Sequence, residues 1–315
     1  MIESSLPSLL NPLQATFYPL GVPVRVVSNR SSVLDTARGE WQHWTRILNV
    51  PPVSLRFDVS TDETDSLPPP VVFSPAHDLP KWTADAKNHA WGDTHGRVVR
   101  ANISPRVARD PAWLLYHFLD PMALQTITAL HLAPIHASCV ARNGRGILLC
   151  GDSHAGKTSL AYACARRGFT YVSDDASYLI RNRAAERVVV GNPHWVRMRP
   201  DATKFFPELA DHPTTVRGNG KPMIRIATQS RPDLSTSATA PIDRIVFLRR
   251  DSKSPAKISR LDPKIVRAWV DQFFYKWDRE GIFAQREAFG TLLAGVRVQA
   301  LEYSDLEAAV DVLSK

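Results

Sequence analysis

The stretch GDSHAGKT, residues 151–158, decides more about the fold than any other part of the chain. It fits the pattern Gly-x4-Gly-Lys-Ser/Thr that is typical of phosphate-binding loops. In such a loop the glycines let the backbone turn tightly, so that several N–H groups point at one anion, and the lysine adds a mobile positive charge. The closing threonine supplies a hydroxyl oxygen, a ligand that suits Mg²⁺. We expect the contacts to nucleotide phosphates to come from Gly151, Asp152, Ser153, His154, Ala155, Gly156, Lys157, Thr158 and Ser159.

The sequence on both sides of this stretch predicts the strand and the helix that such a loop requires. Residues 146–150 are apolar and predict a buried strand, and residues 159–167 predict a helix that ends at Gly168. The positive N-terminal end of that helix would point at the bound phosphates. Upstream, the apolar run 135–142 and the pair Asn143-Gly144 predict a β-hairpin with the 146–150 strand.

Two adjacent aspartates, Asp174 and Asp175, come at the end of a predicted strand over residues 169–173. Because the carboxyl ends of parallel strands face the ligand crevice of an open sheet, we expect both carboxylates to lie beside the phosphates. One can bind Mg²⁺ or one of its waters, and the other can take a proton from an attacking hydroxyl group. An Asx turn or a helix cap is the structural alternative, because aspartate also favours those positions.

Two further features each allow two interpretations. His136 lies in the apolar run, where a histidine is more often a hydrogen-bonded core residue than a member of a site. The basic segment 217–221 can be a hairpin turn or a loop that touches a phosphorylated substrate, and the turn is the commoner outcome.

Hydrophobic periodicity predicts an α/β chain with two domains, 1–115 and 116–315. The first is expected to be a smaller α+β domain that recognises a substrate, forms an oligomer interface, or does both. Its expected elements are strands at 22–28 and 53–59 and a helix at 32–47, and a helical pattern at 111–130 spans the expected boundary. The second is expected to contain further strands at 188–190, 242–248 and 296–303, with helices at 263–277 and 306–313.

Composition narrows the class of protein. The 315 residues are 44% hydrophobic and 22% charged, which is typical of a globular domain and excludes wholesale disorder or a coiled coil. The formal net charge of +8 favours anionic partners such as nucleotides. Lysine and arginine are scattered along the chain, however, so nucleic acid is not the expected partner.

Several features bear on the expected location. The N-terminus lacks the basic and apolar regions of a signal peptide, and the most apolar stretch, 121–140, is interrupted by histidines and prolines. We therefore expect no membrane partner. The odd number of cysteines, three without paired spacing, predicts neither a disulfide framework nor a zinc finger and indicates a cytoplasmic protein.

Four segments together resemble the C-terminal catalytic domain of HPr kinase/phosphorylase. They are His136-Ala137-Ser138, the 151–158 stretch, Arg167-Gly168-Phe169 and Asp174-Asp175, in the family's order and spacing. The resemblance is dense over residues 134–180. It departs from the family pattern at Ala137, where the family has glycine, and in lacking the downstream Arg-Gly-x-Gly segment with its metal-binding glutamate.

The resemblance implies a P-loop phosphotransferase fold of the kind shared with phosphoenolpyruvate carboxykinases. It implies ATP and Mg²⁺ as cofactors and a serine of a carrier protein as acceptor. By carry-over, Lys157 would bind the terminal phosphates, Thr158 and Asp175 the metal, and Asp174 would be the general base supported by Asp175. His136 would line the same pocket.

Two functions follow from these expectations. The first is a kinase that transfers a phosphoryl group from Mg-ATP to a hydroxyl group of a protein serine or of a small molecule. The alternative is a regulatory or partner protein that binds ATP without transfer, and the missing downstream metal-binding segment favours it.

Overall fold

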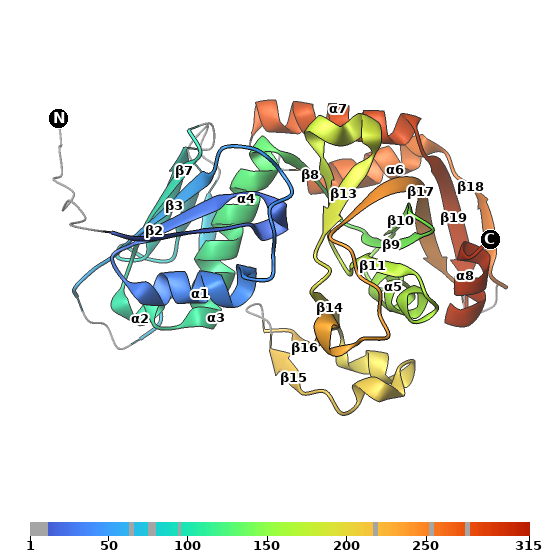
Figure 1. The fold of residues 1–315 in the computed structure, drawn as a ribbon, viewed down its shortest axis with the longest axis horizontal. Coiled ribbons are helices and arrows are strands. Elements are labelled where there is room, and N and C mark those ends of the chain that lie inside the picture. Colours follow the sequence, from blue (N-terminus) through green and yellow to red (C-terminus); the bar gives the residue numbers. More distant parts are fainter. Residues whose placement is uncertain are drawn as a thin grey trace. The chain divides into compact units, whose positions relative to one another are not determined.

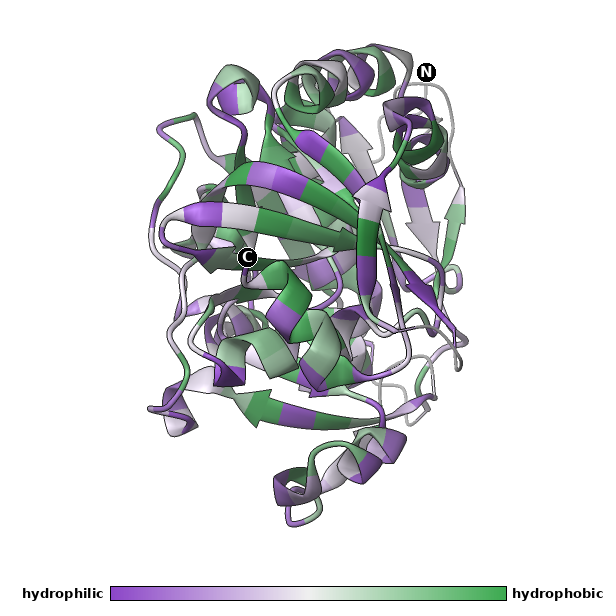
Figure 2. Ribbon diagram, turned by 90° about the vertical axis from the view of Figure 1, so that its right-hand side faces the viewer, coloured by the Kyte–Doolittle hydropathy of each residue, from purple (hydrophilic) through white to green (hydrophobic). Residues whose placement is uncertain are grey.

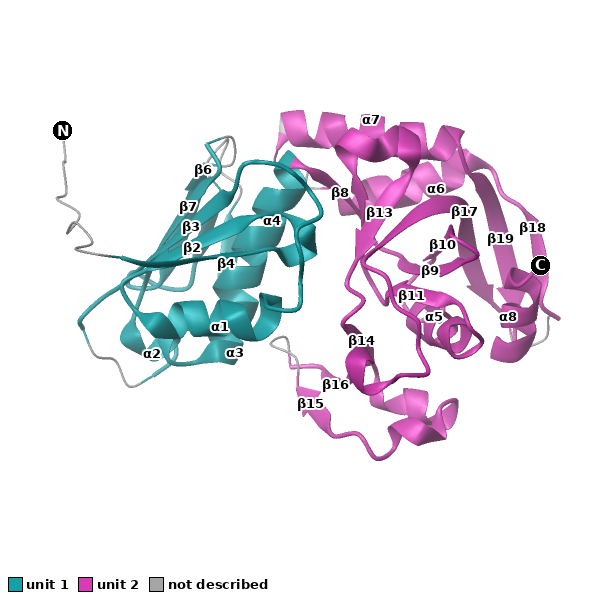
Figure 3. Ribbon diagram, viewed as in Figure 1, with its two compact units in different colours: residues 1–130 teal, residues 131–315 magenta. Residues whose placement is uncertain are grey.

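The computed structural model describes residues 12–62, 66–74, 80–93, 96–216, 220–251, 255–274 and 278–315. The chain is a mixed α/β protein that divides into two compact units, Met1–Leu130 and His131–Lys315 (Figure 3). This division falls later than the predicted one between residues 115 and 116, because helix α4 (Asp120–Leu130) packs on strand β3 (Val53–Val59) of the first unit. The Trp41 indole N–H also donates a hydrogen bond to the Asp120 carboxylate, at 3.1 Å.

The first unit is built around one mixed sheet, of which Figure 1 labels β2, β3 and β7. Its described strands run in the order β1-β2-β3-β7-β6-β5-β4. Strands β2, β3 and β7 are parallel, and the other neighbours are antiparallel. The strands not yet given are β1 (Leu13–Phe17), β2 (Val24–Ser28), β4 (Val72–Ser74), β5 (Lys81–Thr83), β6 (His89–Asp93) and β7 (Val98–Ile103). The helices are η1 (Pro19–Gly21), α1 (Ser31–Trp41), α2 (Pro105–Ala108), α3 (Pro111–Leu114) and the π-helical turn η2 (Leu115–Leu119).

The second unit contains a larger mixed sheet with helices on both faces. The strands are β8 (Leu132–Ile135), β9 (Ser138–Arg142), β10 (Arg145–Cys150), β11 (Thr170–Ser173), β12 (Ser177–Ile180), β13 (Val188–Gly191), β17 (Thr239–Arg250), β18 (Lys257–Arg260) and β19 (Arg297–Tyr303). The long strand β17 pairs with β13 through its first residues and with β10 and β19 through the rest. The helices are α5 (Lys157–Arg166), η3 (Arg181–Glu186), α6 (Pro263–Val270), η7 (Asp271–Phe273), α7 (Arg279–Ala294) and α8 (Leu306–Leu313).

Alternation along the central strand β10 explains why helices cover both faces. Ile147 and Leu149 pack in a cluster with α5 and α8, whereas Leu148 and Cys150 pack in a cluster with α6 and α7. Successive side chains of a strand point to opposite faces, so an uninterrupted apolar run is buried on both. Figure 2 shows this concentration of hydrophobic residues in the central strands.

A small antiparallel sheet, β14-β16-β15, extends from the second unit. Its strands are β14 (Trp195–Met198), β15 (Thr214–Val216) and β16 (Pro222–Ala227), and the short helices η4 (Pro200–Lys204), η5 (Pro207–Leu209) and η6 (Thr228–Ser230) belong to the same region. Val196, Met198 and Ile226 are buried in the cluster that also contains α5. This packing holds the start of the small sheet against the helix that follows the 151–158 loop.

The predicted hairpin is confirmed, but its first strand is shorter than predicted. Asn143 and Gly144 have positive φ angles of 51° and 74°, and β9 pairs antiparallel with β10. The apolar run divides at His136 and Ala137 into β8, which pairs with β12, and β9, which pairs with β10 and β11. The residues on both sides of this break are apolar, so the hydrophobic pattern could not predict where one strand ends and the next begins.

The cysteines are buried free thiols in the second unit. Cys139 and Cys150 lie on the α6 and α7 side of the sheet, and Cys164 lies on α5. Burial raises the pKa of the Cys150 and Cys164 thiols to about 12 and raises that of Cys139 as well. Among the described residues, no helix has the length and apolar character needed to span a lipid bilayer.

Candidate functional site

The 151–158 loop connects β10 to α5 through three residues with positive φ: Gly151 at 146°, His154 at 71° and Gly156 at 88°. A side chain at Gly156 would collide with the hydroxyl group of Tyr303. That hydroxyl donates a hydrogen bond to the Ala155 carbonyl at 2.7 Å. Burial raises the pKa of Tyr303 to about 12, so the hydroxyl keeps its proton at neutral pH. The pattern glycine is therefore required by both the backbone angle and the close approach of Tyr303.

The Lys157 side chain folds back over this loop. Only 6% of the residue is exposed, and its Nζ donates hydrogen bonds to the carbonyls of Gly151 at 2.7 Å and Asp152 at 3.1 Å. Burial lowers the pKa of Lys157, and the nearby Asp175 carboxylate opposes that shift. The Lys157 ammonium group is thus paired with two carbonyl groups of the loop. It can leave these carbonyls and bind an anion instead.

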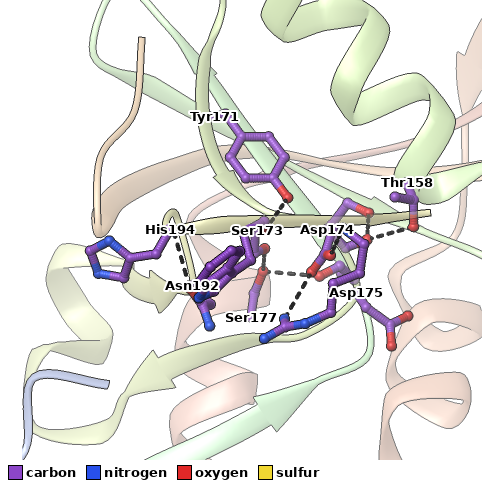
Figure 4. Close-up of polar contacts among 12 residues, drawn as sticks. Thr158, Tyr171, Ser173, Asp174, Asp175, Ser177, Asn192 and His194 are labelled. Carbon is purple, nitrogen blue, oxygen red and sulfur yellow. Dashed lines mark hydrogen bonds and ion pairs between the residues drawn. The ribbon is translucent and has the colours of Figure 1, made fainter. Parts of the chain in front are cut away.

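The carbonyl of Asp174 joins the loop helix to two strands. The Thr158 hydroxyl donates to it at 3.0 Å (Figure 4). The Ser138 hydroxyl donates to the same oxygen. Residue 158 is the second residue of α5, and residue 138 begins β9. The start of α5 is therefore fixed directly beside the end of β11.

The two aspartates have different surroundings, and their side chains point in different directions in Figure 4. Asp174 is 3% exposed, and its Oδ2 accepts a hydrogen bond from the Arg197 backbone N–H at 2.8 Å. Burial raises the pKa of Asp174, and the Arg197 guanidinium group, 4.0 Å from Oδ1, opposes that shift. Asp175, by contrast, has a side chain that is 56% exposed.

The His136 ring lies beside the Asp175 carboxylate. Its Nδ1 lies 3.7 Å from Asp175 Oδ1, and its ring lies 5.0 Å from that of Phe273 and 6.1 Å from that of Trp269. Burial lowers the pKa of His136, and Asp175 raises it by a smaller amount. The Trp269 indole N–H donates to the Asp152 carboxylate at 3.2 Å, so one side chain contacts both the loop and the His136 ring.

These groups surround a cavity of about 340 Å³. The predicted residues that line it are His136, Ser153, His154, Gly156, Lys157, Thr158, Ser159 and Asp175. The structure therefore brings most of the predicted site together. Gly151, Asp152 and Ala155 instead support the loop through the contacts given above. The Asp174 carboxylate lies outside the lining, although the sequence predicted it beside the phosphates and the resemblance implied that it is the general base.

Several lining residues were not singled out by their sequence pattern. They are Arg197, Met198, Arg199, Asp201, Ala202, Phe205, Pro222 and Arg250. Arg250 ends β17, and the rule that pointed to the aspartates, that parallel strands end at the ligand crevice, could have found it. Arg197 and Met198 lie on β14 and Pro222 begins β16, whereas Arg199, Asp201, Ala202 and Phe205 come from the irregular segment between these strands. Lys221 also lines the cavity, while residues 217–219 of the predicted basic segment lie outside the described residues.

Known proteins show little similarity to this chain. The sequence matches no protein-family model, and no curated protein matches it significantly. Among solved structures, the Hpr(Ser) kinase/phosphatase from Coxiella burnetii is similar to it with a TM-score of 0.32 and 13% sequence identity. The alignment covers 57% of this chain and 91% of that chain. At this score the likeness does not indicate what chemistry the cavity performs.

The contact between His136 and Asp175 leads to a testable pH dependence. We expect His136 to titrate below the ordinary histidine pKa of 6.5, because burial disfavours the imidazolium ion. In Asp175→Asn the negative charge that stabilises this ion is gone, so the His136 pKa should fall further. The measurement is an NMR titration of the histidine Cε1–H signals, with His136→Gln used to assign the resonance.

Asp201→Asn, another carboxylate change in the same cavity, is the control and should shift the His136 pKa less. A rise in the His136 pKa in Asp175→Asn would contradict the proposed pairing.

Proposed function

We propose that the unit His131–Lys315 is a phosphotransferase that binds Mg-ATP at the 151–158 loop and transfers the terminal phosphoryl group to a hydroxyl group. One observation carries the proposal: the Lys157 cation and the Asp175–His136 pair face the same cavity. A cavity of this size falls within the range of about 300–1,000 Å³ found for small-molecule sites. Phosphoryl transfer needs a positioned cation for the phosphates and a positioned acceptor for the hydroxyl proton, and this cavity supplies both.

The loop and the start of α5 would bind the phosphates. The backbone N–H groups of the loop and the positive end of the ten-residue helix favour anionic oxygens. Lys157 would exchange its two carbonyl partners for the terminal phosphates, because a charge-assisted hydrogen bond to phosphate is the stronger interaction. Binding therefore requires a movement of the lysine side chain and little movement of the loop.

The oxygen donors present fit Mg²⁺. Thr158 offers a hydroxyl group, and Asp175 offers an exposed carboxylate that can hold a metal-bound water, while phosphate oxygens and water complete the shell. The described residues contain no group of three or more histidine, cysteine or acidic side chains placed to hold a metal, so the substrate phosphates would supply much of the coordination. The ion would neutralise negative charge on the phosphates during transfer.

We assign the general-base role to Asp175 instead of Asp174. The Asp174 carboxylate is buried and engaged with Arg197, whereas Asp175 is exposed to the cavity beside His136. As the acceptor oxygen bonds to the terminal phosphorus, its proton passes to the Asp175 carboxylate. The bond from that phosphorus to the bridging oxygen breaks, and ADP leaves with the electron pair. His136, kept neutral by burial, orients Asp175; Asp174 is a positioning residue.

A labelled phosphate group can reveal transfer to an acceptor of any chemical class. The protein is incubated with γ-labelled ATP, Mg²⁺ and separate protein and small-molecule fractions of a cell extract, and labelled products are identified by mass spectrometry. We expect one fraction to contain a phosphorylated hydroxyl compound that is absent with Lys157→Ala. Stabilisation by ATP without any labelled acceptor would instead support the alternative of a binding protein that performs no transfer.

A further inference from the structure

Phe205 and Arg250 form a flat, exposed pair at the border of the cavity. The Arg250 guanidinium carbon lies 5.1 Å from the centroid of the Phe205 ring. Both residues line the cavity, and Phe205 is 46% exposed although it is a large hydrophobic residue. Phe205 directly follows η4, and its neighbour Phe206 is the one that is buried in the core. Packing in the hydrophobic core therefore does not explain why a phenyl ring is present at position 205.

The sheet topology places this pair on the opposite side of the loop from Asp175. Strands β11 and β10 are both antiparallel to β9, so they run in the same direction, and β17 is parallel to β10. Their carboxyl ends consequently meet at one edge of the sheet in the order β11, β10, β17. Asp175 follows β11, the loop follows β10, and Arg250 ends β17.

Contacts around β19 keep Arg250 close to the loop. In the β17–β19 pairing, Arg250 is opposite Tyr303, and the Tyr303 hydroxyl is bonded to Ala155 of the loop. If the terminal phosphate lies toward Asp175, the remainder of a nucleotide extends across the loop toward Arg250. A phenyl face and a guanidinium plane are the groups on which nucleobases stack, because every base has a π-face.

We propose that Phe205 and Arg250 form the nucleobase subsite of this cavity, with the base stacked on the exposed face of the pair. This inference rests on the proposed function, since it assumes that nucleotide phosphates occupy the 151–158 loop. An anionic group of the acceptor is the competing occupant. It would use the Arg250 charge but gain nothing from an exposed phenyl ring, so the ring favours the base.

The test compares a ligand that has a base with one that lacks it. Dissociation constants of Mg-ATP and of inorganic tripolyphosphate are measured by calorimetry for the wild type and for Phe205→Ala, Phe205→Leu and Phe205→Trp. We expect Phe205→Ala and Phe205→Leu to weaken ATP binding about 5- to 140-fold, the range for loss of one stacked base, and to change tripolyphosphate binding less than about 2-fold. Phe205→Trp should retain ATP binding. The leucine variant keeps an apolar side chain, so it remains informative if the alanine variant is poorly folded.

Phe283→Ala is the matched control, because Phe283 lies on α7 and is 71% exposed outside this cavity. It should leave both dissociation constants unchanged. Unchanged ATP binding in Phe205→Ala and Phe205→Leu, or an equal loss for both ligands, would overturn the subsite while leaving the phosphate site intact. Unchanged ATP binding with a raised KM for the acceptor would assign the pair to acceptor recognition instead. If the wild type binds neither ligand, or if Lys157→Ala weakens neither, the proposed function fails and the subsite fails with it.

Discussion

Replacement of Asp175 by asparagine should slow phosphoryl transfer about 10²- to 10⁴-fold, the usual contribution of a general base. The amide has nearly the shape of the carboxylate but cannot accept the hydroxyl proton. Asp175 is exposed, so neither folding nor the structure of the loop should depend on its charge. We expect the dissociation constant of ATP to change only a few-fold. ADP release in the presence of acceptor gives the rate, and calorimetry gives the affinity.

Asp174→Asn is the matched comparison for this prediction. Asparagine retains a side-chain oxygen that can accept the Arg197 backbone N–H, but it loses the attraction between the carboxylate and the Arg197 guanidinium group. We expect a smaller loss of rate than in Asp175→Asn. If Asp174→Asn folds normally and loses as much activity as predicted for Asp175→Asn, while Asp175→Asn remains active, the base is Asp174, as the family resemblance implied.

Substitution of Lys157 by alanine should remove the stabilisation that ATP gives to the protein. At ATP concentrations of about a hundred times the dissociation constant, the wild type should gain about 2.7 kcal/mol in its free energy of unfolding. The variant should gain almost nothing, because the cation that pairs with the terminal phosphates is absent. Thermal unfolding with and without Mg-ATP is the measurement.

The ligand-free Lys157→Ala protein should remain folded. Because burial lowers the Lys157 pKa, the protonated amine is less stable in the native state than in the unfolded chain, and this cost disappears in the variant. Lys157→Met, which keeps most of the aliphatic chain, should behave in the same way. Lys257→Ala, an exposed change on β18, is the control and should respond to ATP as the wild type does. Full ATP stabilisation of Lys157→Ala would show that the loop does not bind the phosphates as proposed.

The parts of the site that the sequence predicted are those in which local chemistry determines geometry. Gly156 is required by a positive φ and by the approach of Tyr303, and the apolar run before the loop forms a strand buried on both faces. Strand β3 spans Val53–Val59, as its alternating pattern predicted. The predicted helix 263–277, in contrast, is α-helical over Pro263–Val270 and continues as the short helix η7, while residues 275–277 lie outside the described residues.

The parts that the sequence did not predict depend on contacts between distant residues. The surroundings of Asp174 and Asp175 differ because Arg197, on a strand of the small sheet, contacts Asp174. The sequence near residue 174 contains no pattern that predicts this contact. Phe205 lies in an irregular segment, where exposure cannot be read from a periodic pattern. The division between the compact units likewise depends on a distant contact, the packing of α4 on β3.

The burial of Cys139, Cys150 and Cys164 has a practical consequence. Maleimide reagents attack thiolates, and burial with a raised pKa suppresses that form in the native protein. A cysteine introduced at an exposed position would therefore be alkylated first, without removal of the native ones. A fluorophore attached in this way at the rim of the cavity could follow ligand arrival and departure in real time.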